Sequence, residues 1–418
     1  MVMSWASPCL LAWAVVARAA AWNGTLRTDD EAAVQYPAMV GNGHLAAEVL
    51  RLQYVSGADG ASECPQGSEA LSEEEFVYFN TDVGAARVPQ RTRVCKKQLQ
   101  VVYLAGVFNG PSAKHQDGAH GEISHRAAVP APITAGPVAA GPAGRIAAEL
   151  DLQRGVYVRR ALVAKDPEIT FEQRIYAHRA RPSLMVAEYW ADWVGGPEAF
   201  PVRLQGPPVV DGTFPDFDWQ VRTERLAAQG FDGAGAEVTV WTGRTRRHEN
   251  GGDGLVDVAL VAYAPRDLTL GRGGMGALMA AYRTTLDSED PLTAAKRDLR
   301  QALADVYKDR NALFQEHVQA WEALWQSGFS VSGRPDVAQA VQASTYYILS
   351  SLREDRPYSL SPGGLASNGY NGHTFWDTET WMYPPLLVWY PALARSVLDY
   401  RAARLPAARA KARSYDPP

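Results

Sequence analysis

Residues 364–385 read GLASNGYNGHTFWDTETWMYPP, and this stretch, hereafter the strip, decides how the rest of the chain is interpreted. It combines two carboxylates, one histidine and several aromatic side chains in a short run. Glycines before the aromatic residues allow tight turns, and the pair Pro384 and Pro385 suits the first turn of a helix. The pattern therefore predicts a loop that presents polar and aromatic side chains at the start of a helix, an arrangement typical of binding and catalytic sites.

The two carboxylates of the strip, Asp377 and Glu379, are two residues apart, so in an extended segment both would project to the same side. Paired carboxylates beside aromatic faces suit glycoside chemistry, because an oxocarbenium-like transition state needs negative charge and proton transfer nearby. Carboxylates this close in sequence more often bind one sugar together than act as acid and base on opposite sides of a glycosidic bond. Catalysis would therefore require a further carboxylate from elsewhere. Neighbouring side chains could stack on a sugar ring or hydrogen-bond its hydroxyls: Tyr370, Asn371, His373, Trp376 and Trp381. The alternative is that Asp377 caps a helix and the aromatic residues fill a core.

Length and composition set broad bounds on the protein. At 418 residues the chain exceeds one typical domain. A hydrophobic content of 46% with 21% charged residues is ordinary for a globular protein. The net charge of −5 gives no indication of nucleic-acid binding. No stretch has the length and apolar character expected of a membrane span.

The N-terminus predicts export. Residues 5–21 are short, apolar and end in A-x-A patterns, so we interpret residues 1–21 as a signal peptide of a secreted or lysosomal protein. The alternative is a buried N-terminal helix in a cytoplasmic protein. Export would make Asn23 in Asn-Gly-Thr a glycosylation site. Cys64 and Cys95 would then form a disulfide or remain two unpaired thiols, because spacing does not establish geometry.

The first two thirds of the chain predict strands. Residues 22–285 consist of short apolar runs, many of them alternating or rich in β-branched and aromatic residues, separated by Gly, Pro, Asp and Asn. Their number and spacing favour a large antiparallel β-sandwich domain. Within it, residues 116–144 and 195–217 are rich in Gly, Pro and Ala and predict long loops.

The pattern changes to helical periodicity near residue 286. Residues 286–325 have helical spacing with Pro291 near a helix start, so we predict a helical linker over residues 286–332. Two further helices are predicted: Asp336–Leu352, and Leu386–Ala412 with interruptions at Pro391 and Pro406.

The strip and the residues behind it resemble the start of the catalytic barrel in glycoside hydrolase family sixty-five. The resemblance rests on NGYNGHTFWDTETWMYPPLL (residues 368–387) and YPALARSVLDYRAARLPAARAKA (residues 390–412), a long run that is rich in rare residue types. Further similar segments are spread over most of the chain: residues 41–45, 103–110, 124–126, 172–179 and 361–365. The similarity looks greatest to members acting on the glucosyl-galactosyl-hydroxylysine unit of collagen and on trehalose.

The resemblance implies an α+β multidomain fold. Its parts would be an N-terminal β-sandwich over residues 22–285, a helical linker over 286–332, and the beginning of an (α/α)6 barrel of the six-hairpin glycosidase type over 333–418. It also implies an inverting hydrolase that releases glucose from an α-glucosyl disaccharide unit, with a carbohydrate substrate as partner and no cofactor. A disaccharide phosphorylase, or a non-catalytic carbohydrate-binding or interaction protein built on the β-sandwich, is the alternative.

By the same resemblance, Trp376 and Asp377 lie in the glucose-binding subsite. The remaining expected substrate contacts are Glu379, His373, Tyr370 and Trp381. The family's general acid and its catalytic base or phosphate site are implied to lie beyond residue 418, so no catalytic residue is expected within this chain. Because inversion needs two carboxyl groups about 6.5–9.5 Å apart, we expect the chain to be an inactive, truncated part of a longer hydrolase.

Other polar clusters are weaker candidates. The spacing of His115, His120 and His125 matches no standard zinc pattern, so no metal site is expected. The resemblance places His125 and Arg126 where the sandwich meets the barrel, and a purely structural role is the alternative. Arg401 could pair with a carboxylate or lie on a helix surface. The basic run at residues 244–247 is interpreted as a solvated loop.

Overall fold

A computed structural model describes most of the chain. The described residues are 24–28, 38–49, 53–56, 69–70, 94–97, 101–110, 124–132, 146–165, 168–193, 199–203, 214, 216–231, 233, 235–247, 254–265, 267–358, 360–367 and 369–415. The predicted signal peptide, Asn23, Cys64 and the side chain of Cys95 lie outside this description. The secretion signal, the glycosylation site and the disulfide therefore stay predictions.

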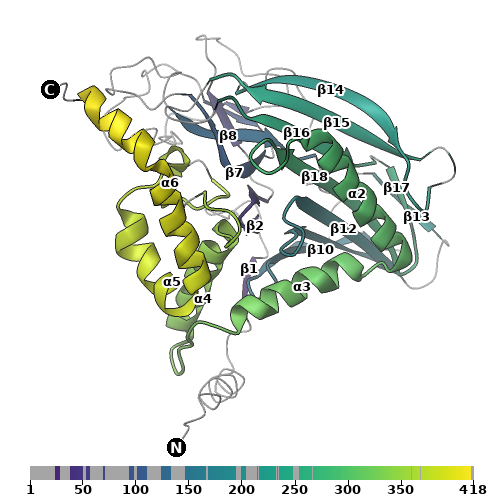
Figure 1. Ribbon diagram of the computed structural model, residues 1–418. Coiled ribbons are helices and arrows are strands. Elements are labelled where there is room, and N and C mark those ends of the chain that lie inside the picture. The colour runs from purple at the N-terminus through teal and green to yellow at the C-terminus, as the bar shows by residue number, and fades with distance from the viewer. Residues whose placement is uncertain are drawn as a thin grey trace, which may run out of the picture.

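The largest sheet among the described residues has nine strands, and every neighbouring pair in it is antiparallel (Figure 1). Its central strands are buried at nearly every position and not only at alternate ones, because layers cover both faces of the sheet. In spatial order the strands are β1 (Thr25–Thr28), β9 (Ile146–Asp151), β10 (Val156–Lys165), β11 (Glu168–Ala177), β12 (Leu184–Trp193), β18 (Gly274–Thr284), β16 (Asp257–Tyr263), β15 (Ala236–Thr245) and β14 (Phe217–Leu226).

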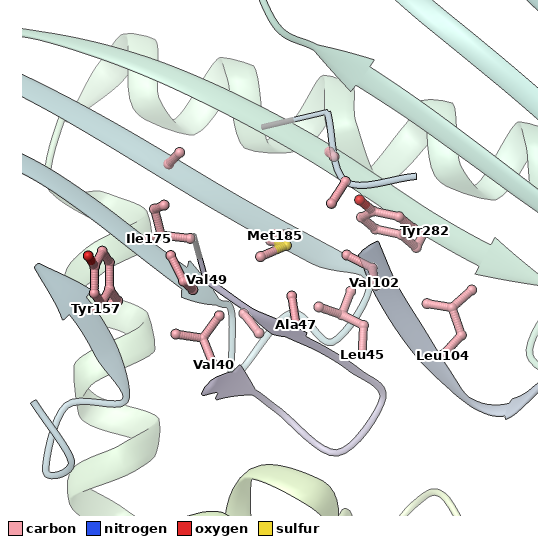
Figure 2. Packing of buried hydrophobic residues seen from close by; sticks show 14 of the residues in the cluster. Val40, Leu45, Ala47, Val49, Val102, Leu104, Tyr157, Ile175, Met185 and Tyr282 are labelled. Carbon is pink, nitrogen blue, oxygen red and sulfur yellow. The ribbon is translucent and has the colours of Figure 1, made fainter. Parts of the chain in front are cut away.

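A smaller sheet covers one face of the large sheet. Its strands, in spatial order, are β2 (Met39–Gly41), β3 (Leu45–Glu48), β7 (Val101–Asn109) and β8 (His125–Pro130). Figure 2 shows side chains of the small sheet, such as Leu45 and Val102, meeting Met185 and Tyr282 of the large sheet in a single apolar cluster. Full burial of each such aliphatic side chain contributes about 1.5–3 kcal/mol. This shared core fixes the position of the small sheet.

The described residues form two further small sheets. They are β4 (Gln53–Ser56) with β6 (Val94–Lys97) and β5 (Glu69–Ala70), and β13 (Ala199–Arg203) with β17 (Asp267–Gly271). The predicted loops at 116–144 and 195–217 are wrong in part, because they contain β8 and β13. Both strands are defined by pairing with distant partners, which local Gly and Pro content does not reveal.

The helix α2 (Pro291–Lys308) covers the opposite face of the large sheet and buries Leu299 and Leu303 against it. The next helix, α3 (Ala312–Trp325), buries Leu313 in the same cluster, and its Trp321 joins the cluster that the two sheets share. The α2 helix begins as the sequence predicts, with Pro291 in its first turn and the Asp290 carboxylate accepting a hydrogen bond from the Thr293 N–H.

Three further helices lie beside the sheets (Figure 1). They are α4 (Pro335–Ser351), α5 (Tyr383–Trp389) and α6 (Pro391–Tyr415). The predicted interruption at Pro391 is confirmed, because α6 begins there. The interruption at Pro406 is wrong: the helix continues through it, between strong helix formers such as Ala403 and Ala407. The order of antiparallel sheets followed by helices is confirmed, and none of the described helices is long and apolar enough to cross a membrane.

The end of α4 is fastened to the sheets by a buried arginine. Arg179, which follows β11, donates through Nη1 to the carbonyl oxygens of Asn42, Leu349 and Leu352 at 2.9, 2.8 and 3.0 Å. At the turn between β2 and β3, the Gly43 N–H donates to Ser350 O at 2.8 Å. A Cβ at Gly43 would lie 2.2 Å from the Leu352 backbone, so the turn requires glycine there.

Candidate functional site

The first half of the strip is a tightly turned loop. Gly364 has φ of 71°, and three consecutive residues, Tyr370, Asn371 and Gly372, have φ of 56°, 55° and 72° within the short turn η2 (Gly369–Gly372). The left-handed region costs a non-glycine residue roughly 1–2 kcal/mol. Backbone strain of this kind persists only where the surrounding structure enforces it, and it clusters at functional sites.

The second half of the strip is helical. Asp377 has helical backbone angles and leads into one turn of π-helix, η3 (Thr378–Met382), which continues into α5. The Thr378 hydroxyl is buried and donates to Leu360 O at 2.7 Å, which fixes the start of this turn. The condition under which both carboxylates would project to the same side, an extended segment, is therefore not met. On a helical turn, residues two apart do not face each other, so Asp377 and Glu379 do not project to one side.

Glu379 is bound to Arg401 of α6. Arg401 Nε and Nη2 donate to Glu379 Oε1 and Oε2 at 2.6 and 2.9 Å, a bidentate pair, and Nη2 also donates to Phe375 O at 3.2 Å. Of the two alternatives for Arg401, pairing with a carboxylate is the one observed. The pair links the strip to α6 and engages both carboxylate oxygens of Glu379.

Three aromatic residues of the strip are exposed. Trp376 and Trp381 are 64% and 65% exposed and their ring centroids are 6.1 Å apart, while Tyr370 is 41% exposed. Among the described residues, these three side chains do not fill a core. Between them, the Asp377 side chain makes no capping hydrogen bond, so the helix-capping alternative is not observed either. The strip presents two indole rings and a carboxylate on an exposed surface, which suits stacking and hydrogen bonding to a polar ring.

His373 lies against the small sheet. Its ring centroid is 5.9 Å from that of Phe108 in β7 and 6.5 Å from that of Phe375. Phe375 in turn meets Tyr370 edge-on at 5.4 Å. The structure thus brings His373 and Tyr370 together through Phe375, and it adds Phe108 as a residue that sequence reasoning did not single out.

Arg126 of β8 is hydrogen-bonded to the loop in the first half of the strip. It is 4% exposed and its Nη1 donates to Gly364 O, Leu365 O and Ser367 O at 2.8, 3.2 and 2.9 Å. Its Nη2 donates to Gly372 O at 3.2 Å. Burial lowers the pKa of Arg126 to about 10, so the guanidinium stays charged near neutral pH.

The other face of β8 holds a separate polar cluster. His125 Nε2 lies 2.8 Å from Asp216 Oδ1, and Asn109 Nδ2 donates to the same oxygen at 2.9 Å. Asn109 and His125 are cross-strand partners, as are Phe108 and Arg126, so the two pairs face opposite sides of the small sheet. His115 and His120 lie outside the described residues, and no group of three or more metal-binding side chains is found in the part of the chain that is described.

A conserved-domain match covers the strip. The family described as "Glycosyl hydrolase family 65 central catalytic domain" matches residues 344–416, which include the strip and α6. The resemblance to glycoside hydrolase family sixty-five predicted from the sequence is therefore confirmed for this part of the chain.

Curated relatives and one solved structure extend the match. The chain is 31% identical over 322 residues to the protein-glucosylgalactosylhydroxylysine glucosidase of Dictyostelium discoideum, covering 75% of this chain and 42% of that protein. It is 39% identical over 139 residues to the kojibiose hydrolase of Flavobacterium johnsoniae, covering 33% of this chain and 20% of that protein. A structure assigned as a kojibiose phosphorylase from the human microbiome has the same fold, with a TM-score of 0.58 at 13% identity, over 90% of this chain and 47% of that one. The chain thus spans less than half the length of each of these relatives.

Proposed function

We propose that the strip binds the glucosyl unit of an α-linked glucoside, and that the protein is an inverting glycoside hydrolase releasing glucose from a disaccharide unit. The glucosyl-galactosyl-hydroxylysine unit of collagen and trehalose are the first candidate substrates. In this proposal α4, α5 and α6 begin an (α/α)6 barrel, and the protein is secreted or lysosomal.

The observation that supports the proposal most is the exposure of Trp376 and Trp381 on either side of Asp377. Two exposed indole rings that flank a carboxylate in the sequence offer the surface that binding of a polar ring requires. An indole face can cover the C–H face of a pyranose, and a carboxylate can accept hydrogen bonds from its hydroxyls. The relatives that are similar to this chain are named for acting on glucosyl disaccharides, which agrees with that chemistry.

The two carboxylates have different roles in this proposal. Both oxygens of Glu379 accept hydrogen bonds from Arg401, so Glu379 anchors the strip to α6. Asp377 has no capping bond and is the residue proposed to accept hydrogen bonds from the sugar. Tyr370 and His373, which lie in the loop of the strip, would contact the edge of the sugar ring. None of the described residues is proposed as the general acid or base.

Measurement of saccharide binding tests the proposal that the strip binds a glucosyl unit. Titration calorimetry with trehalose, kojibiose and glucosyl-galactosyl-hydroxylysine should give a measurable dissociation constant for at least one. Trp376→Ala should weaken that binding roughly tenfold, the scale of one aromatic contact, and Asp377→Asn should weaken it as well. Tyr307→Ala, which removes a 62% exposed aromatic residue of α2 far from the strip in sequence, is the matched control and should leave binding unchanged. Equal affinity in all three variants would refute the assignment of the strip.

Product analysis tests the reaction. Inversion at an α-glucoside releases β-glucose, which proton NMR distinguishes from α-glucose before mutarotation. Release of β-glucose without phosphate supports the hydrolase, and formation of a glucose phosphate only with added phosphate supports a phosphorylase instead. Because no described residue is proposed as the general acid or base, saccharide binding without product from this chain would support the binding role of the strip and leave the hydrolase reaction unsupported.

A further inference from the structure

We propose that Arg126 is a positioning residue: from the small sheet, it holds the loop of the strip in the conformation that presents Tyr370, His373 and Trp376 to a saccharide. The inference rests on the proposed function for its last step, since it concerns the shape of the same site. Its structural part, that Arg126 determines the conformation of the loop, stands on contacts alone.

The hydrogen bonds of Arg126 span the loop from end to end. Three of its carbonyl acceptors, those of Gly364, Leu365 and Ser367, lie at the start of the strip, and the fourth, that of Gly372, lies at the end of the left-handed turn. One planar guanidinium therefore fixes the separation of two loop segments. A lysine ammonium lacks this fork and could not reproduce the geometry.

The turn between these segments is strained. Tyr370 and Asn371 both lie in the left-handed region, which costs non-glycine residues roughly 1–2 kcal/mol each. The buried charge–carbonyl hydrogen bond at Gly372 lies at the end of the turn, where release of the loop would relieve the strain. Without Arg126 the loop is expected to relax, and the side chains on either side of the turn would move with it.

Close packing couples the same arginine to the site side chains. Gly372 lies directly on the guanidinium, because a Cβ there would approach Arg126 Nε to 2.8 Å and Cζ to 2.9 Å. The Arg126 Cζ is 6.0 Å from the centre of the Phe108 ring, and that ring is the one His373 packs against. Arg126 and Phe108 are cross-strand partners in the small sheet. Arg126 holds the loop, and its neighbour Phe108 packs against His373.

Arg179 provides a matched control for burial and charge. It is also buried, also charged, and also donates to several backbone carbonyls, but its acceptors belong to Asn42 and to the end of α4. None of the hydrogen bonds found for it reaches the strip. Loss of Arg179 should therefore reduce stability without releasing the loop.

Hydrogen exchange followed by mass spectrometry on the full chain tests the structural part. In Arg126→Ala, amides of residues 364–376 should exchange roughly tenfold faster or more, while the central strands β11 and β12 keep their protection. Methylguanidinium at millimolar concentration should restore the slow exchange by filling the vacated site. Arg179→Ala should leave exchange of residues 364–376 at the wild-type rate. Unchanged exchange in a folded Arg126→Ala, or equal acceleration in Arg179→Ala, would overturn the proposal.

Saccharide affinity tests the functional part, with Arg126→Lys as a second variant in case Arg126→Ala does not fold. Arg126→Lys should keep the charge but weaken binding of the saccharide identified above roughly tenfold, and Arg179→Lys should not. If the wild-type chain binds no saccharide, the proposed function fails, yet the exchange measurement still decides whether Arg126 positions the loop. If binding in Arg126→Lys equals wild type, Arg126 does not shape the site.

Discussion

Two groups of tryptophans in this protein have opposite surroundings. Trp321 of α3 is 0% exposed, stacks on Tyr346 at 5.1 Å and lies against the guanidinium of Arg179. Trp376 and Trp381 of the strip are 64% and 65% exposed. The same residue type therefore holds the helices on the sheets in one region and faces solvent in the other. The difference separates a packed interior from a strip whose indole rings are open to contact, and saccharide binding is the role proposed for these rings.

The largest effect should come from Trp321→Ala. Removal of a fully buried indole leaves a cavity beside Tyr346, so the free energy of unfolding should fall by about 3–5 kcal/mol. Trp376→Ala, in the strip, should change it by no more than about 0.5 kcal/mol. Urea unfolding followed by circular dichroism measures both. Similar losses for the two variants would show that Trp376 is packed as tightly as Trp321.

The next largest effect is the pH dependence of the free energy of unfolding, because the protein interior contains buried, neutral histidines. Burial lowers the pKa of His317 to about 3 and that of His44 to about 4, from an ordinary value near 6.5. The unfolded chain binds these protons first, so their contribution to stability is complete above pH ~6.5 and is lost as the pH falls toward the folded values. The loss from His317 alone is on the order of 3 kcal/mol by pH ~4.

The variant His317→Gln checks this pH dependence. Glutamine can still accept the hydrogen bond that the Arg179 N–H donates to His317 Nδ1 at 3.1 Å, but it does not titrate. The unfolding free energy of the variant, measured from pH 7 down to pH 4, should therefore decline less steeply than that of wild type. Parallel curves would mean that His317 is not responsible for the acid sensitivity.

Two glycine substitutions with a smaller effect on the free energy of unfolding should distinguish backbone strain from close packing in the strip. Gly372→Ala places a side chain in the left-handed region and against Arg126, so it should cost about 1–3 kcal/mol. The matched control is Gly273→Ala, where φ is +60° and the space around a Cβ is open. That change should cost only about 1 kcal/mol, the backbone term alone. Thermal unfolding gives both values, and an equal cost would contradict close packing of Gly372 on Arg126.

The smallest effect should come from the ion pair on the exposed side. Arg401→Ala breaks the pair with Glu379, whose side chains are 41% and 42% exposed, so solvent screening limits the loss to less than about 1 kcal/mol. Arg395→Ala breaks the Arg395–Asp399 pair in the same helix and should cost about as little. Denaturation at low and high salt measures both. A loss of several kcal/mol for Arg401→Ala would show that solvent does not screen this ion pair and that it contributes substantially to stability.

Local pattern was sufficient for most elements of the fold. The apolar runs of β11, β12 and β16 and the helical spacing of α4 predict the observed elements, because burial on one or two faces repeats along the chain. The pattern failed where no repeat exists. The strip combines two left-handed non-glycine residues with a single π-turn, so its backbone follows neither the strand nor the helix period. Asp377 and Glu379 therefore do not share a side, as they would in an extended segment.

By itself, the sequence determined the kinds of elements, their order and the identity of the strip, since residue spacing and rare motifs are local properties. Tertiary structure alone decided which aromatic residues are buried, that Glu379 pairs with Arg401, and that Arg126 holds the loop. The reason is physical: Arg126 and its acceptors in Gly364 and Gly372 are separated by 238 and 246 residues. A hydrogen bond between such distant residues depends on how the sheets and helices pack, and no local pattern specifies it.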